Sequence, residues 1–184
     1  MFEALKDPTV YRSQWPFQIR YATGKILNVG CNNDGGKFAE RGAINVDLCL
    51  KDECNGQRIP AHVLADARFL PFKASSFDTV VLGEILEHMN AADAVNALCQ
   101  AKAVLKTGGR IVATIPHDDR KPQEQGYGGM WDMEYYPGIS RYHSREITRF
   151  EFFDWMKKAG LKIILWGQIF HMWGKQGTGV VAVL

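Results

Sequence analysis

Short apolar runs separated by polar turns recur along the chain. Residues 25–30 form the clearest run, which ends abruptly in a loop of Gly, Asn and Asp. A continuous apolar run of this length between turn signals is typical of a buried strand in a parallel sheet. By these criteria, strands are expected at 25–30, 43–47, 62–65, 77–82, 110–115, 161–166 and 178–184.

Helical periodicity appears between several of these runs. Asn90 is a suitable N-cap for a helix that reaches Lys106, and the apolar residues between them recur at helical spacing. A short helix is expected at about 36–40. A last helix is expected to be capped by Ser144 and to end at Gly160.

Strands that alternate with helices predict an α/β fold, Rossmann-like, with a mostly parallel sheet and helices on both faces. We expect seven strands, with an antiparallel C-terminal strand that closes a hairpin with residues 161–166. The length of 184 residues suits one domain, 1–184. Residues 1–24 are expected to form a helical cap. The long aperiodic segment 116–143 is expected to be an insertion that closes over a substrate as a lid.

Composition narrows the functional classes. Apolar residues make up 46% of the chain and charged residues 23%, as in ordinary globular proteins, and the net charge of +2 does not favour nucleic acid as a partner. The four cysteines lack the spacing of a zinc site and suggest no disulfide framework. No signal peptide or membrane-spanning stretch is evident, so we expect a cytoplasmic protein that does not bind membranes.

The ends of the first two expected strands carry residues suited to ligand binding. Gly30 and Asn32 tolerate positive φ, and glycine leaves no side chain to hold a ligand away. Asp47 ends the second strand, where nucleotide-binding α/β folds carry the acid that binds a ribose. Together these residues predict a nucleoside held at the strand ends.

Five segments with these features occur in an order that resembles the class I S-adenosylmethionine-dependent methyltransferases. They are residues 26–31, 45–47, 65–72, 77–89 and 105–110. The resemblance covers the chain from about residue 25 to its C-terminus, and the expected antiparallel last strand also fits that family. It implies a single methyltransferase domain with S-adenosyl-L-methionine as its cofactor.

The resemblance also implies roles for individual residues. Asp47 would accept hydrogen bonds from both ribose hydroxyls, and Asp66 would accept one from the adenine amino group unless it caps the following turn. Asn28 stands where the family usually carries an acid, and Asn32 where it usually carries a glycine. The expected cofactor-binding residues are Asn28, Gly30, Cys31, Asn32, Asp47, Leu48, Asp66, Ala67, Gly83 and Glu84.

Candidate catalytic residues follow the fifth expected strand. His117 should lie at the carboxyl end of that strand, where open α/β sheets bind ligands, and its pKa range suits a general base. His143 is the alternative base. Glu84, Glu87 and His88 would share one face of a helical turn and hold a divalent cation, or would only shape the pocket. We expect the second role, and therefore no metal.

The leading functional prediction is O-methylation of a small molecule such as a sugar or a phenol by an S-adenosylmethionine-dependent enzyme. One alternative is a metal-assisted RNA 2′-O-methyltransferase. Another is a cofactor-binding partner subunit without catalytic activity. A nicotinamide oxidoreductase is disfavoured because no G-x-G-x-x-G follows the first expected strand.

Overall fold

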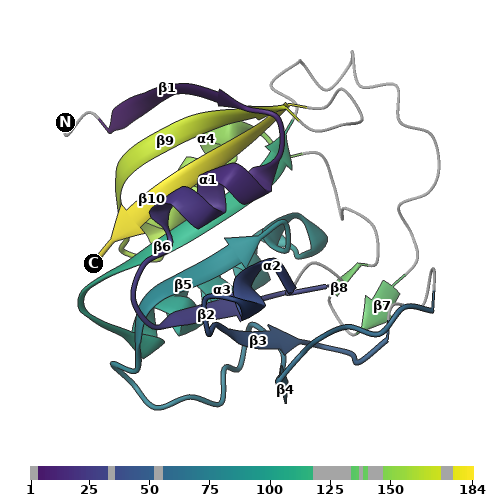
Figure 1. Ribbon diagram of the computed structural model, residues 1–184. Coiled ribbons are helices and arrows are strands. Elements are labelled where there is room, and N and C mark those ends of the chain that lie inside the picture. The colour runs from purple at the N-terminus through teal and green to yellow at the C-terminus, as the bar shows by residue number, and fades with distance from the viewer. Residues whose placement is uncertain are drawn as a thin grey trace.

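The computed structural model describes residues 4–32, 36–51, 56–117, 134–136, 139–140, 147–170 and 176–184. Eight strands form one sheet in the order β1-β9-β10-β6-β5-β2-β3-β4 (Figure 1). Their bounds are β1 (Leu5–Tyr11), β2 (Ile26–Val29), β3 (Ile44–Asp47), β4 (Val63–Leu64), β5 (Phe77–Gly83), β6 (Leu105–His117), β9 (Lys162–Phe170) and β10 (Gln176–Val183). Two short strands, β7 (Glu134–Tyr136) and β8 (Ile139–Ser140), pair with each other outside this sheet.

The sheet confirms the predicted Rossmann-like class. β10 pairs antiparallel with both β6 and β9, while the other pairings within the eight strands are parallel. The predicted number of seven strands is wrong, because β1 adds an eighth at the edge beside β9.

The N-terminal segment is therefore a strand followed by a helix, rather than helical throughout. β1 pairs in parallel with β9, and its register shifts between Lys6 and Val10, around Pro8. Proline lacks the N–H needed in the interior of a sheet and is confined to edges and irregularities. Asp7 and Tyr11 are the buried members of β1, so the segment shows none of the apolar alternation that marks a strand.

Tyrosine hydroxyls attach β1 to helix α1 (Gln14–Tyr21). The Asp7 carboxylate accepts hydrogen bonds from the hydroxyl of Tyr11, at 2.6 Å, and from that of Tyr21. Burial alone would raise the pKa of Asp7, but these hydrogen bonds together outweigh it and hold the pKa well below its usual value. Asp7 is thus ionised and fixes α1 against the edge of the sheet.

Helices cover both faces of the sheet, as predicted. In Figure 1, α1 and α2 (Gly36–Ala39) lie in front of the strands, and α3 (Ala91–Val104) and α4 (Arg149–Lys158) lie behind them. Asn90 caps α3 as expected and accepts a hydrogen bond from the Asp93 N–H at 2.9 Å. α4 is capped by Thr148 in a capping box rather than by Ser144, which lies outside the described residues.

Each face has its own apolar core. Phe17 of α1 and Phe38 of α2 pack on one face, whereas Leu98 of α3 and Phe152 of α4 belong to the larger cluster on the other face. None of the helices in the described ranges is long and apolar enough to cross a membrane.

The strand order fixes where the chain can bind a ligand. From β2 the chain proceeds outward to β3 and β4, while β5 leads to β6 on the other side of β2. Ligands of open α/β sheets bind outside the carboxyl ends of the strands at such a switch point. The ends of β2, β5 and their neighbours therefore form the candidate site.

Candidate functional site

The turn after β2 is fastened to the end of β3 by backbone hydrogen bonds. The N–H groups of Gly30 and Cys31 donate to the carbonyl of Val46 at 2.9 and 3.1 Å. Gly30 has a φ of +70°, and a Cβ added there would lie 1.9 Å from Cγ2 of Ile85, which follows β5. Only glycine fits between the two central strand ends, so the sequence requirement at position 30 is steric as well as conformational.

Asp47 completes this turn. Its Oδ2 accepts a hydrogen bond from the N–H of Asn32 at 2.8 Å, and its Oδ1 accepts one from the N–H of Leu48 at 2.8 Å. Asn32 adopts a φ of +42°, which asparagine tolerates better than most residues. The structure thus brings together Gly30, Asn32 and Asp47, as the sequence predicted.

Cys31 is buried beneath the same turn, with 2% of its surface exposed. Burial, followed by the nearby charge of Asp47, raises the pKa of its thiol to about 12. The thiolate is the reactive form of cysteine, so Cys31 is not a nucleophile at neutral pH. Any contact it makes with a ligand would come from its backbone.

Asn28 lies within the sheet rather than at its edge. Its side chain is 4% exposed and donates through Nδ2 to Oδ1 of Asn45 on β3, at 3.1 Å. Asn45 is buried as well, and its own amide donates to the carbonyl of Pro60. These contacts join neighbouring strands, and the predicted role of Asn28 in cofactor binding stays a prediction.

Asp66, the predicted adenine ligand, is engaged by its neighbour. Its carboxylate accepts hydrogen bonds from the Arg68 backbone N–H at 2.8 Å and from the Arg68 guanidinium at 2.7–3.1 Å. Arg68 also contacts Asp93 on α3 at 3.0 Å. These contacts are the ones expected if Asp66 caps the turn that follows it, which was the alternative to adenine binding. Ala67 is buried in the core beside it, and the adenine role of both residues stays a prediction.

The acidic turn after β5 differs from the helical turn that the sequence suggested. Gly83 ends β5, Glu84 has a φ of +54°, and residues Leu86–His88 form a 3₁₀ turn. Successive side chains in such a turn point about 120° apart, so Glu87 and His88 diverge. Glu87 is 1% exposed, whereas His88 is partly exposed.

Glu87 is an unusual carboxyl group because it is buried. Burial, followed by the nearby charge of Glu84, raises the pKa of Glu87 well above its usual value. A neutral acid is a poor metal ligand. Among the described residues, no group of three or more His, Cys, Asp or Glu side chains is placed to hold a metal ion.

The structure places the predicted catalytic histidines only in part. His117 is the last residue of β6 and pairs with Gln176 of β10, so its backbone lies at the carboxyl end of the sheet. Its side chain and all of His143 lie outside what the structure describes. The predicted lid, 116–143, begins too early, because Pro116 and His117 still belong to β6. The rest of it lies outside the described residues apart from the strand pair β7 and β8.

Sequence reasoning missed one part of the site, namely Gln18 in the second half of α1. Gln18 is fully buried, and its Nε2 donates to Oγ1 of Thr114 on β6 at 2.8 Å. A Cβ added to Gly83 would lie 2.6 Å from this Nε2, so the amide rests against the end of β5. The sequence offered no signal for it, because a glutamine in an amphipathic segment is expected to face water.

The sheet order and the residues at these strand ends define an open α/β domain of the Rossmann-like class. The turn after β2 is of the kind that such domains use to bind nucleotides. Residues 27–113 match the family model described as a methyltransferase domain. This match covers a little under half of the chain, and it supports the resemblance to class I S-adenosylmethionine-dependent methyltransferases that the sequence predicted. No curated protein matches the chain in sequence.

Solved structures support the fold assignment. A S-adenosylmethionine-dependent methyltransferase from Methanosarcina mazei has a TM-score of 0.62 at 15% identity, covering 91% of this chain and 96% of its own. A possible histamine N-methyltransferase from Thermotoga maritima has a TM-score of 0.63 at 17% identity, with 94% and 88% covered. The 1,6-didemethyltoxoflavin-N1-methyltransferase of Burkholderia thailandensis, solved with bound 1,6-didemethyltoxoflavin and S-adenosylhomocysteine, has a TM-score of 0.63 at 16% identity, with 92% and 75% covered.

Proposed function

We propose that the chain uses S-adenosylmethionine to methylate an oxygen atom of a small molecule such as a sugar or a phenol. The observation that carries this proposal is the turn Gly30–Asn32, which is bound to the Asp47 carboxylate at the switch point of the sheet. The family match over residues 27–113 supports the choice of cofactor. So does the S-adenosylhomocysteine bound in the Burkholderia structure of the same fold.

The chemistry of Asp47 fits a ribose. A carboxylate has about four lone-pair positions on its two oxygens. The N–H groups of Asn32 and Leu48 occupy one on each oxygen at short range, and the N–H of Cys49 lies farther away at 3.4 Å. The Sγ of Cys49 also lies 3.8 Å from Oδ1. A position therefore remains on Oδ2, and the long Cys49 contacts at Oδ1 can give way to a second hydroxyl, while the two short backbone bonds hold the carboxylate in place.

When bound, the cofactor supplies a methyl group already activated on a sulfonium, so the protein has to align the acceptor and remove its proton. We assign proton removal to His117, with His143 as the second candidate. His117 would take the proton of the acceptor hydroxyl as the oxygen–carbon bond forms and the carbon–sulfur bond breaks. Its place at the end of β6 supports this role.

The metal-assisted RNA alternative is weakened by the turn after β5. It requires Glu84, Glu87 and His88 to converge on one ion. Glu87 is instead buried with a raised pKa, in a 3₁₀ turn from which His88 points elsewhere. We therefore keep RNA only as an acceptor to be tested.

Calorimetry with S-adenosylhomocysteine tests the proposal first, and a radiolabelled methyl-transfer screen over sugars, phenols, amines and RNA follows. We expect binding of the product and transfer to a hydroxyl compound. Absence of binding would contradict the cofactor, and transfer to an amine or to RNA would contradict the acceptor. Amines belong in the screen because two of the similar structures are described as N-methyltransferases. Binding without transfer to any acceptor would favour the non-catalytic subunit.

Replacing the proposed base tests the mechanism. His117→Ala should lower kcat by about 10²-fold or more, the usual contribution of a general base, and leave S-adenosylhomocysteine affinity unchanged. A chelator should leave most of the wild-type activity intact. Loss of turnover with the chelator, together with an active His117→Ala variant, would reverse these roles and favour the metal-assisted alternative.

A further inference from the structure

The side-chain amide of Gln18, on α1, is buried, and its nitrogen makes a hydrogen bond whereas its oxygen makes none within the described residues. Its Nε2 donates to Oγ1 of Thr114 at 2.8 Å, while Oε1 has no hydrogen-bond partner among the described residues. The residue is 0% exposed. Native proteins rarely leave such a group unsatisfied, and those that remain call for an explanation such as a ligand.

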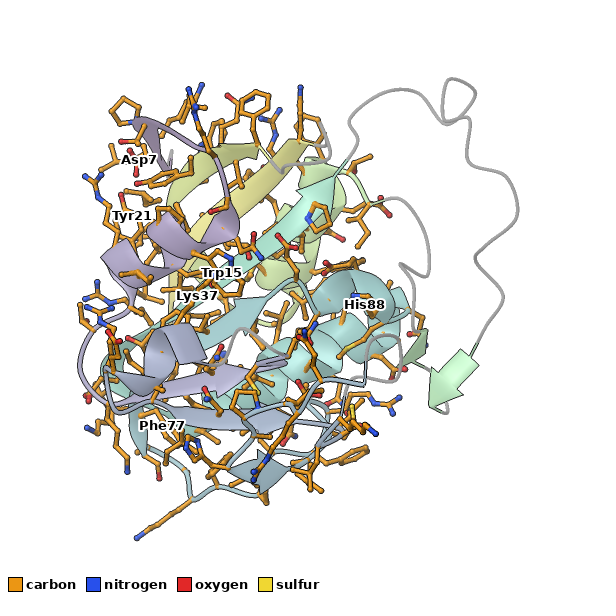
Figure 2. The ribbon with its side chains drawn as sticks, turned by 45° about the vertical axis from the view of Figure 1, so that its right-hand side comes forward. Asp7, Trp15, Tyr21, Lys37, Phe77 and His88 are labelled. Atoms are coloured by element: carbon orange, nitrogen blue, oxygen red, sulfur yellow. The ribbon has the colours of Figure 1, made fainter. Side chains whose placement is uncertain are left out.

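The position of this amide is fixed from several sides. The ammonium group of Lys37, on α2, lies 4.1 Å from the ring centroid of Trp15, one turn before Gln18 on α1 (Figure 2). Arg41 donates to the carbonyls of Ile19 and Ala22 at the other end of the helix. α1 is thus held to the segment that follows the β2 turn, and its glutamine cannot easily turn away to another partner.

The amide also has a definite place relative to the proposed ribose site. It rests against Gly83 and Thr114, at the ends of β5 and β6, whereas Asp47 ends β3. β2 lies between β5 and β3 in the sheet. Adjacent strands are about 4.8 Å apart, and the amide is two to three strands from β3, so it lies roughly 10–14 Å from Asp47 along the carboxyl edge. A cofactor whose ribose is at Asp47 can therefore direct its amino acid end toward Gln18.

We propose that Gln18 binds the amino acid end of the cofactor, with Oε1 accepting a hydrogen bond from the ammonium group. An amide carbonyl only accepts hydrogen bonds, and the ammonium is the strongest donor at that end of the molecule. Thr114 is then a positioning residue, because its hydroxyl fixes the other end of the amide. This inference rests on the proposed function, since it assumes that S-adenosylmethionine is the cofactor.

Two probes separate this contact from the ribose contact. S-adenosylhomocysteine carries the amino acid end, and 5′-methylthioadenosine has the same nucleoside and thioether without it. Gln18→Met keeps the length of the side chain and removes its polar atoms. By calorimetry it should weaken S-adenosylhomocysteine about tenfold and leave 5′-methylthioadenosine within twofold of the wild-type affinity.

Three further variants complete the experiment. Thr114→Val should show the same selective loss to a smaller extent, and it also serves if Gln18→Met does not fold. Gln14→Met, one turn earlier on α1, should change neither affinity, whereas Asp47→Ala should weaken both probes.

Equal effects of Gln18→Met on both probes, or none on either, would overturn the role of Gln18 while leaving the proposed function intact. Failure of the wild-type protein to bind either probe would overturn the proposed function itself. A normal affinity for S-adenosylhomocysteine combined with a raised KM for the methyl acceptor would also contradict our assignment, because the amide would then contact the acceptor.

Discussion

Asp47 and Asp66 lie in equivalent places at the carboxyl ends of neighbouring strands. Their carboxylates accept hydrogen bonds from different kinds of donor. Asp47 is the last residue of the short parallel strand β3, Asp66 comes two residues after the short parallel strand β4, and each was predicted to bind the cofactor. Asp47 accepts its bonds from the backbone N–H groups of Asn32 and Leu48. Asp66 accepts its bonds mainly from the guanidinium of Arg68, which also contacts Asp93.

The difference separates two uses of an acid at a strand end. Within the described part of the chain, backbone donors and no side-chain cation hold the Asp47 carboxylate, so it keeps capacity for further donors. The Asp66 carboxylate and the Arg68 side chain are each 11% exposed and form a bidentate pair, which ties the turn after β4 to α3. We infer that the first acid serves binding and the second serves mainly the fold.

The largest effect is expected from the turn that carries Asp47. Gly30→Ala forces a Cβ to 1.9 Å from Ile85 at a φ of +70°, and should destabilise the protein by about 3 kcal/mol through strain and overpacking. Gly42→Ala is the matched control, because Gly42 has a φ of +66° with no atom within 4 Å of the added Cβ. It should cost only about 1 kcal/mol of backbone strain. Equal stability losses in urea titrations of both variants would show that the contact with Ile85 is not restrictive.

Removing Asp66 should affect stability more than binding. Asp66→Ala takes the bidentate partner away from the largely buried Arg68, which keeps its contact with Asp93. Because half of a partly buried pair is lost, we expect a decrease of about 2–3 kcal/mol in the free energy of unfolding. The affinity for S-adenosylhomocysteine should change less than threefold. If calorimetry shows a larger loss of affinity with little loss of stability, Asp66 contacts the adenine after all.

Removing Asp47 should affect cofactor binding more than stability. Asp47→Ala takes away the acceptor for two ribose hydroxyls and should weaken S-adenosylhomocysteine by about 2 kcal/mol, or roughly thirtyfold. Stability should fall by no more than about 1 kcal/mol, because the N–H groups of Asn32 and Leu48 lie near the surface and can bond to water. An unchanged affinity would remove Asp47 from the site and with it the contrast with Asp66.

Much of the scaffold around these acids was predictable from the sequence, because it follows from local rules. The apolar runs ending at Gly30 and Asp47 formed the expected parallel strands, and Asn90 capped the expected helix. Their convergence at one edge follows from the parallel topology alone.

The features that the sequence did not predict depend on contacts between residues far apart in the chain, or on a choice between possible partners that a local pattern cannot make. β1 was missed because its buried members are Asp7 and Tyr11, and their burial depends on a hydroxyl from α1. Gln18 was missed because its partner Thr114 is 96 residues away. Arg68 is only two residues from Asp66 in the sequence. No local pattern, however, shows whether an acid binds a neighbouring arginine or a ligand.

The smallest effect concerns Glu87, a third acid at this edge of the sheet, which differs from Asp47 and Asp66 in being almost fully buried with a raised pKa. Its pKa in the folded protein is raised above its value in the unfolded chain, first by burial and then by Glu84. The unfolded state therefore releases this proton at lower pH than the folded state does. Folding is favoured most below the unfolded pKa, and this contribution is lost as pH rises toward the folded pKa.

Glu87→Gln should remove that pH dependence. The variant cannot ionise, so its stability relative to wild type should increase between pH 5 and pH 8 when both are compared by thermal unfolding. Asp78→Asn is a suitable control that should be flat between pH 5 and pH 8 and show the opposite sign when the comparison is extended below the usual pKa of an aspartate. The hydrogen bond from Lys106, followed by that from the Lys25 N–H, lowers the pKa of Asp78, so its carboxylate favours folding above the unfolded pKa. A parallel pH profile for Glu87→Gln and wild type would show that Glu87 is ionised in the folded protein. It would then be a charged acid at the site, and the metal-assisted alternative would regain a ligand.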